Sequence, residues 1–180
     1  MFANSLYTFS CIKTISEHSD GVNCVIYAKR YEYKTIITAS KDSTLKIFRL
    51  NYKKNKSLYT CVGHEGEVLT AAYMSKCDKN LVISGGIDNT LRVWSVDKGK
   101  LFNTFDFGYS AGLTNLYYFP DDANKIISST ANDSLITFWT FHYNKELELE
   151  LEKQEKEEKE ERERNKNKTK TTKVELQMEL

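Results

Sequence analysis

Short apolar stretches separated by polar turns follow one another along the first 144 residues of the chain. Residues 67–107 show the pattern most clearly. EVLTAAYM, LVISGG, LRVWSV and LFNTFDF are rich in β-branched and aromatic side chains, and polar segments containing Asp, Asn, Gly and Lys separate them. Such runs are typical of β-strands, and none follows the 3.6-residue period of an amphipathic helix. The pattern predicts an antiparallel meander of four strands.

This unit occurs three times along the chain. An acidic residue and, six positions later, an aromatic residue recur at intervals of 46 and 45 residues. These pairs are Asp42–Phe48, Asp88–Trp94 and Asp133–Trp139. A four-stranded sheet has two faces to cover, and similar sheets stacked around an axis cover both, so the period predicts β-propeller blades.

The second unit resembles the blades of the WD-repeat β-propeller family. It has Gly63-His64 ahead of its first strand, Ser84 on the second, Asp88 in the following turn and Trp94 on the third. Ser95 stands where the family pattern has an acid directly after the Trp. The other two units resemble degraded copies: Glu17-His18, Thr38, Asp42 and Phe48 in the first, and Gly108-Tyr109, Ser129, Asp133 and Trp139 in the third.

The resemblance implies a structural hydrogen-bond network inside each blade, running from indole through hydroxyl and imidazole to carboxylate. These four groups can satisfy one another, because indole only donates, an ionised carboxylate only accepts, and the other two do both. Phe48 has no donor, so the first chain must be broken there. We therefore expect the middle blade to be the most rigid.

His64, Ser84 and Asp88 are also the ingredients of a Ser-His-Asp hydrolase. A catalytic set would occur once, whereas this one recurs with the repeat, and no glycine-flanked nucleophile elbow surrounds Ser84. The structural interpretation is therefore favoured, and we expect no enzyme activity.

The resemblance implies an all-β fold of three four-stranded antiparallel WD-repeat blades. It covers roughly residues 6–143, within a predicted propeller segment of residues 1–144, with repeats at about 18–56, 64–99 and 109–143. Propellers contain about four to eight blades, so three do not close a ring comfortably. Either the sequence is a fragment of a longer chain, which is the simpler interpretation, or the ring is completed by self-assembly or by another propeller protein.

A charged, low-complexity segment follows at residues 145–171, and we expect it to be helical or disordered. The first leucines of this segment recur every two residues, so the segment lacks the sustained heptad that a coiled coil requires. Residues 172–180 alternate again between apolar and polar side chains. Two interpretations stay open: these residues supply the outer strand of the last blade, or they form a disordered tail.

Charge, hydropathy and cysteine spacing indicate which classes of partner and cofactor the sequence disfavours. The net charge is +1, with 16 basic against 13 acidic residues in 1–144 and 10 against 12 in 145–180, so no strong basic excess favours nucleic acid. No apolar run could span a membrane, and Cys11, Cys24, Cys61 and Cys77 lack paired metal-ligand spacing. We expect a cytoplasmic or nuclear protein with no metal or other cofactor.

The resemblance implies a non-catalytic scaffold or adaptor that binds proteins within a multiprotein complex. Four tyrosines on the predicted inner strands are expected to pack between blades, with a binding hot spot as the alternative: Tyr27, Tyr73, Tyr117 and Tyr118. A second function stays open, a subunit of a ribosome-biogenesis assembly such as the small-subunit processome, or another RNA-associated propeller protein.

Overall fold

The computed structural model describes residues 10–30, 33–50, 56–75, 79–106, 108, 112–119, 125–132, 134–146, 153 and 156–157. The chain divides into two compact units, Met1–Phe141 and His142–Leu180. All the strands among the described residues lie in the first unit. The predicted segments 145–171 and 172–180 lie almost entirely outside the described residues.

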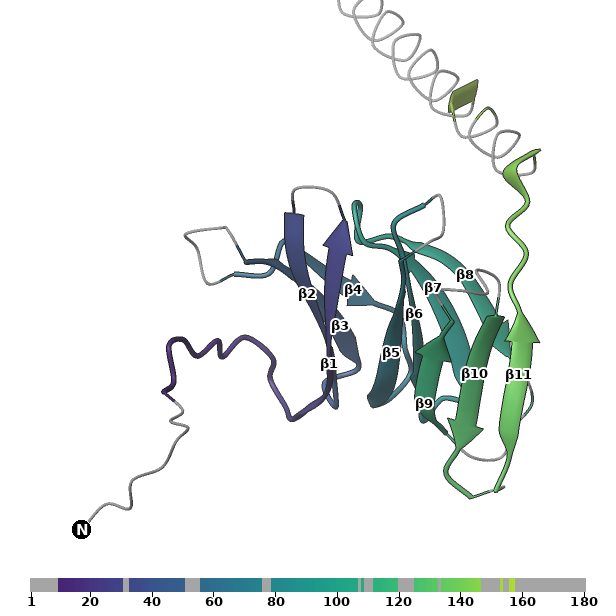
Figure 1. Cartoon of the computed structure of the whole chain (residues 1–180), viewed down its shortest axis with the longest axis horizontal. Coiled ribbons are helices and arrows are strands. Elements are labelled where there is room, and N and C mark those ends of the chain that lie inside the picture. The colour runs from purple at the N-terminus through teal and green to yellow at the C-terminus, as the bar shows by residue number, and fades with distance from the viewer. Residues whose placement is uncertain are drawn as a thin grey trace, which may run out of the picture. The chain divides into compact units, whose positions relative to one another are not determined.

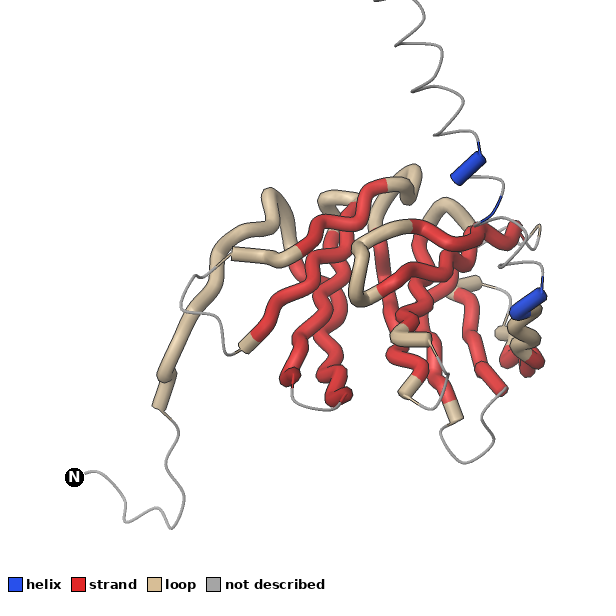
Figure 2. The backbone as a smooth tube through the Cα atoms, turned by 90° about the horizontal axis from the view of Figure 1, so that it is seen from above, coloured by secondary structure: helices blue, strands red, loops and turns tan. Residues whose placement is uncertain are grey.

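The described part of the chain forms three antiparallel sheets, ordered β1-β2-β3-β4, β5-β6-β7-β8 and β11-β10-β9 (Figures 1 and 2). The strands of the first sheet are β1 (Val22–Arg30), β2 (Tyr33–Ser40), β3 (Thr44–Arg49) and β4 (Tyr59–Val62). Those of the second are β5 (Val68–Met74), β6 (Leu81–Gly86), β7 (Thr90–Ser95) and β8 (Leu101–Asp106). The third contains β9 (Leu113–Tyr118), β10 (Lys125–Thr130) and β11 (Ile136–Thr140).

The predicted all-β fold of propeller-like blades is confirmed. Four strands form each of the first two sheets, as predicted, and three described strands form the third. The fourth strand proposed for that sheet, residues 172–180, lies outside the described residues.

The second hairpin of every sheet contains one non-glycine residue in the left-handed conformation. Ser43, Asn89 and Ser134 have φ values of 68°, 61° and 51°, the left-handed conformation that tight turns require. In the first two sheets, the Asp just before this residue accepts a hydrogen bond from the backbone N–H two positions on, at 3.0 Å for Asp42 and 3.2 Å for Asp88. The Asp side chain thus fixes the turn and, with it, the register of the two strands.

The core formed by the described residues consists of two apolar layers, one between each pair of neighbouring sheets. Residues of β6 and β7 alternate between them: Val82 and Trp94 belong to the layer shared with the first sheet, and Ile83 and Val93 to the layer shared with the third. Because successive side chains of a strand point to opposite faces, the middle sheet is covered on both sides. The outer sheets each contribute one face to these layers.

Candidate functional site

A chain of four buried or nearly buried side chains crosses the middle sheet. Nε1 of Trp94 donates to Oγ of Ser84 at 2.8 Å, and this hydroxyl lies 2.7 Å from Nε2 of His64. Nδ1 of His64 lies 2.8 Å from a carboxylate oxygen of Asp88. Since the indole can only donate and the carboxylate only accept, every proton points one way: Trp94 to Ser84, Ser84 to His64, and His64 to Asp88.

Each member of this chain is positioned by local structure. Trp94 on β7 faces Val82 on β6, and Ser84, two residues further along β6, projects from the same face. Asp88 occupies the turn between these strands. His64 enters from the segment ahead of β5, where Gly86 leaves room: a Cβ there would lie 2.7 Å from the Glu67 carbonyl oxygen and 3.2 Å from Nδ1 of His64.

The electrostatics agree with this proton arrangement. Burial lowers the pKa of His64 and outweighs the opposing effect of the Asp88 charge, so the ring is neutral at neutral pH. Burial raises the pKa of Asp88. The hydrogen bond from the Glu65 N–H, together with the hydrogen bond and the electrostatic interaction with the His64 ring, outweighs burial and holds this pKa below its usual range. Arg92 adds a cation 3.6 Å from the same carboxylate.

The first sheet contains a shorter version of the chain. His18 lies 2.7 Å from both Asp42 and Thr38, and the Thr44 hydroxyl donates to Asp42 at 2.6 Å. Burial opposes ionisation of Asp42, but these bonds outweigh it and hold its pKa well below the usual range. Phe48 replaces the indole donor, as expected from the sequence.

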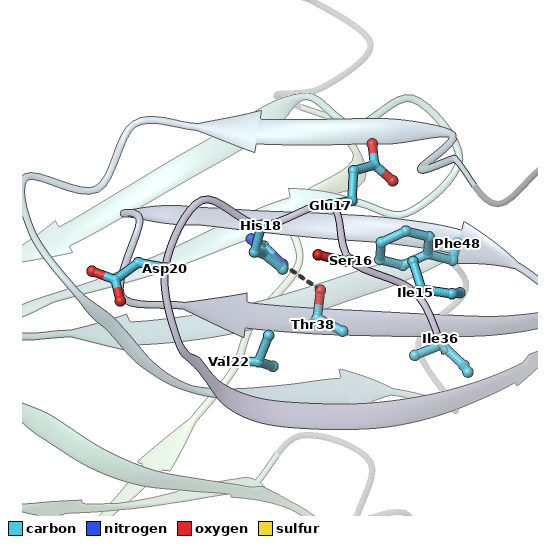
Figure 3. Close-up of a pocket in the computed structure, with 9 residues that line it drawn as sticks. All are labelled: Ile15, Ser16, Glu17, His18, Asp20, Val22, Ile36, Thr38 and Phe48. Carbon is cyan, nitrogen blue, oxygen red and sulfur yellow. Dashed lines mark hydrogen bonds between the residues drawn. The ribbon is translucent and has the colours of Figure 1, made fainter. Parts of the chain in front are cut away.

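A pocket of about 220 Å³ lies beside this broken chain. Figure 3 shows the His18–Thr38 hydrogen bond within it and the phenyl ring of Phe48 on its wall. The Thr38 hydroxyl also approaches the Lys46 carbonyl oxygen at 3.4 Å. The lining residues are Ile15, Ser16, Glu17, His18, Asp20, Val22, Ile36, Thr38 and Phe48.

In the third sheet, the serine assignment made from the sequence is wrong. Nε1 of Trp139 donates to Oγ of Ser128 at 2.8 Å, whereas Oγ of Ser129 lies 3.1 Å from the Thr114 hydroxyl and accepts from Asn115 at 3.2 Å. Trp139 faces Ile126, so the residue two positions further along β10 is Ser128. Indole and hydroxyl are 11 residues apart here and 10 apart in the second sheet, because this hairpin holds one extra residue. Asp133 and Tyr109 lie outside the described residues.

Sequence reasoning also missed two threonines. Thr44 and Thr90 follow two positions after the aspartates of the first two sheets, and their backbone N–H groups hold those carboxylates in place. The Asp-x-Thr spacing was the available signal, since it is typical of an Asx turn.

The Ser84 hydroxyl in the hydrogen-bond chain of the middle sheet is not available as a nucleophile. Ser84 is fully buried, and its hydroxyl accepts from the indole while donating to the imidazole. No substrate atom can approach its oxygen without displacing one of these partners. The His–hydroxyl–Asp set occurs in both the first and second sheets, in keeping with a structural role.

Other reactive groups in the described residues do not gather into a site. Within that part of the chain, no three His, Cys, Asp or Glu side chains are close enough to hold a metal ion. Burial raises the pKa of the Cys61 thiol to about 11, which leaves it protonated and unreactive. Among the described residues, no helix has the length and hydropathy needed to cross a membrane.

A shallow groove of about 480 Å³ runs across the neighbouring strands β1, β5 and β9. All four tyrosines singled out from the sequence line it, but they divide into two kinds. Tyr118 is buried in the second apolar layer and Tyr73 packs against the first, as expected for blade packing. Tyr27 and Tyr117 are exposed, and Tyr117 contacts Phe119 edge-on at a ring distance of 5.2 Å.

Comparison with known proteins agrees with this geometry. Residues 9–49 and 55–95 match the family model described as WD domain, G-beta repeat, so the predicted resemblance is confirmed for the first two units. Mitogen-activated protein kinase kinase kinase A of Dictyostelium discoideum is 30% identical over 112 residues, 61% of this chain and 11% of that protein. WD repeat-containing protein 36 of Homo sapiens is 37% identical over 73 residues, 37% of this chain and 8% of that protein.

Mitochondrial division protein 1 of Saccharomyces cerevisiae (strain YJM789) is 27% identical over 120 residues, covering 57% of this chain. The aligned part is 16% of that protein. The chain thus spans only a small part of the length of the relatives it matches.

Proposed function

We propose that this chain, which carries WD40 repeats at residues 9–49 and 55–95, is a non-catalytic scaffold or adaptor that binds proteins within a multiprotein complex. The observation that supports the proposal is how the potentially reactive side chains are bonded. Ser84, His64 and Asp88 are hydrogen-bonded to one another and to Trp94 inside the middle sheet.

The exposed aromatic groups support a binding role. Tyr27 and Tyr117 offer large, amphipathic rings on the groove that crosses three sheets. Aromatic side chains are enriched in protein interfaces, where they bury much area and lose little conformational entropy. The sheets hold these strands rigidly, so a partner segment binding there orders few groups on the scaffold side.

Affinity purification of the chain tests this function. We expect protein partners that persist after nuclease treatment and at raised salt, and that are weakened by the double variant Tyr27→Ser/Tyr117→Ser. Phe102→Ser is the matched control, because Phe102 is an exposed aromatic residue on β8, away from the groove. Partners lost equally from both variants, or from neither, would contradict the assignment of this groove.

Two further measurements distinguish a scaffold from an RNA-associated subunit and from a hydrolase. An RNA-associated subunit would lose its partners with nuclease and show retention on RNA that falls steeply with salt. A hydrolase would be labelled at Ser84 by a serine-reactive probe. Either result would overturn the scaffold proposal.

A further inference from the structure

The hydroxyl oxygen of Thr38 lacks the donor that its counterpart in the middle sheet has. Thr38 on β2 stands where the middle sheet has Ser84. Phe48 on β3 stands where it has Trp94, so a phenyl ring replaces an indole that donates at 2.8 Å. With the Thr38 proton directed at Nε2 of His18, 2.7 Å away, no N–H or O–H group of the described residues donates to the Thr38 oxygen.

This acceptor lies in the wall of the pocket of about 220 Å³ described above. Thr38 is only 9% exposed, and buried polar groups are normally satisfied by hydrogen bonds. Ile15, Ile36 and Phe48 supply apolar wall around it (Figure 3). Since an apolar cavity of about 150 Å³ holds a benzene molecule, this pocket has room for a larger aromatic ring system.

The carboxylates around the pocket already have partners. Glu17 accepts from the N–H and the hydroxyl of Ser57, both at 2.6 Å, and lies 3.8 Å from the ammonium group of Lys46. Asp20 accepts from the Gly21 N–H at 2.6 Å. The acceptor that still lacks a donor is therefore a neutral hydroxyl oxygen. A neutral donor on an apolar body fits it better than a cation, which would lose its hydration in the pocket.

The missing donor does not depend on sheets outside this chain. Both partners of the Ser84 hydroxyl, Trp94 and His64, come from the middle sheet itself and from the segment that leads into it. None of the hydrogen bonds described for Ser84 comes from the first sheet, although that sheet packs on the same face. An analogous sheet ahead of the first one would thus cover the pocket without supplying the donor that Thr38 lacks.

We propose that this pocket binds a flat aromatic group with a single N–H donor, of which indole is the simplest example. The ring lies against Phe48 and the two isoleucines, and its N–H donates to the Thr38 oxygen. This chemistry has two sources, a free small molecule or the tryptophan side chain of a bound protein. The inference does not rest on the proposed scaffold function, since the pocket and the tyrosine groove share no lining residue.

Two isomeric probes, 3-methylindole and 1-methylindole, test the donor. They have the same size, and only the first has an N–H group. In an NMR titration of the whole chain, followed through the methyl signals of Ile15 and Ile36, we expect 3-methylindole to bind with a dissociation constant of about 1 mM or lower. We expect 1-methylindole to bind about tenfold more weakly. A folded wild type that does not bind 3-methylindole, or that binds both probes equally, would overturn the proposal.

Two variants locate the site. Thr38→Val removes the acceptor and should make the two affinities equal. Phe48→Trp places an indole of the chain's own at the donor position, so binding of 3-methylindole should fall about tenfold or more, whether or not Thr38→Val folds. Phe102→Trp is the matched control for the second variant, because Phe102 is an exposed residue of β8 outside this pocket. Equal affinities for 3-methylindole in the two tryptophan variants would contradict the assignment of the pocket.

N-acetyl-tryptophanamide distinguishes the two sources of the indole ring. It carries the peptide groups that a tryptophan side chain of a bound protein brings with it. Binding as tight as that of 3-methylindole supports a protein side chain as the ligand, whereas binding about tenfold weaker supports a free small molecule.

Discussion

Replacing Asp88 with Ala removes the acceptor at the end of the middle hydrogen-bond chain. The Nδ1–H of His64, whose side chain is fully buried, then loses its acceptor at 2.8 Å and keeps only the Thr90 hydroxyl at 3.4 Å, and a poorly satisfied buried donor costs about 1–3 kcal/mol. The carboxylate also fixes the turn by accepting from the Thr90 N–H at 3.2 Å, a bond worth about 1 kcal/mol. The Glu65 N–H is exposed, so water replaces its bond at little cost. We expect a loss of about 2–4 kcal/mol in unfolding free energy.

Urea denaturation followed by circular dichroism measures this loss. A change of this size lowers the melting temperature of a chain this long by roughly 2–4 °C for each kcal/mol. Asp97→Ala is the matched control, since Asp97 accepts one hydrogen bond from Asn80 at an exposed site. We expect that variant to lose less than about 0.5 kcal/mol. Equal losses in the two variants would refute the idea that the Asp88 carboxylate anchors a buried chain.

Three further outcomes follow from the same geometry. Phe48→Trp should raise stability by about 1 kcal/mol, because the adjoining pocket leaves room for an indole that donates to Thr38, and an unchanged or lower urea midpoint would contradict this. Gly86→Ala should lower the melting temperature, since its Cβ would lie 2.7 Å from the Glu67 carbonyl oxygen, whereas Gly21→Ala, whose Cβ would meet only the Lys41 side chain, at 3.4 Å, serves as the milder comparison. The folded-state pKa of His64 lies below its unfolded value of about 6.5, so its stabilisation is complete above that pH and is lost as pH falls; a urea midpoint that rises between pH 7 and 5 would contradict this.

The sequence predicted the repeated sheets well because the repeat preserves spacing. In the first two units, the hydroxyl-bearing residue precedes the Asp by four positions and the aromatic residue follows it by six. The same offsets place these side chains on one face of the hairpin, and the resemblance to the WD-repeat family then implied the chain of hydrogen bonds.

The third unit shows where such counting fails. One extra residue in the hairpin between β10 and β11 shifts the serine that meets Trp139 from position 129 to position 128. Two adjacent serines gave the sequence no means of choosing between them, since only the strand register decides which one shares a face with the indole.

The sequence also could not predict which apolar side chains of the first and third sheets are exposed. Val25 and Phe138 occupy the same positions in the repeat as Ala71 and Val93 of the middle sheet, which are buried. The sequence pattern shows which face of a strand is apolar, but not whether another sheet covers that face. The three-dimensional arrangement of the sheets was needed to separate the covered faces from the open ones.

The protonation of His64 tests the account's central claim, that its reactive residues hold the sheet together and perform no chemistry. Nitrogen-15 NMR of the imidazole reports both the tautomer and the charge as pH is lowered. We predict a neutral ring with its proton on Nδ1 at pH 7, since burial lowers the pKa of His64, whereas a general base works best with a pKa near the operating pH. A ring that is charged at pH 7, or one that carries its proton on Nε2, would contradict the account.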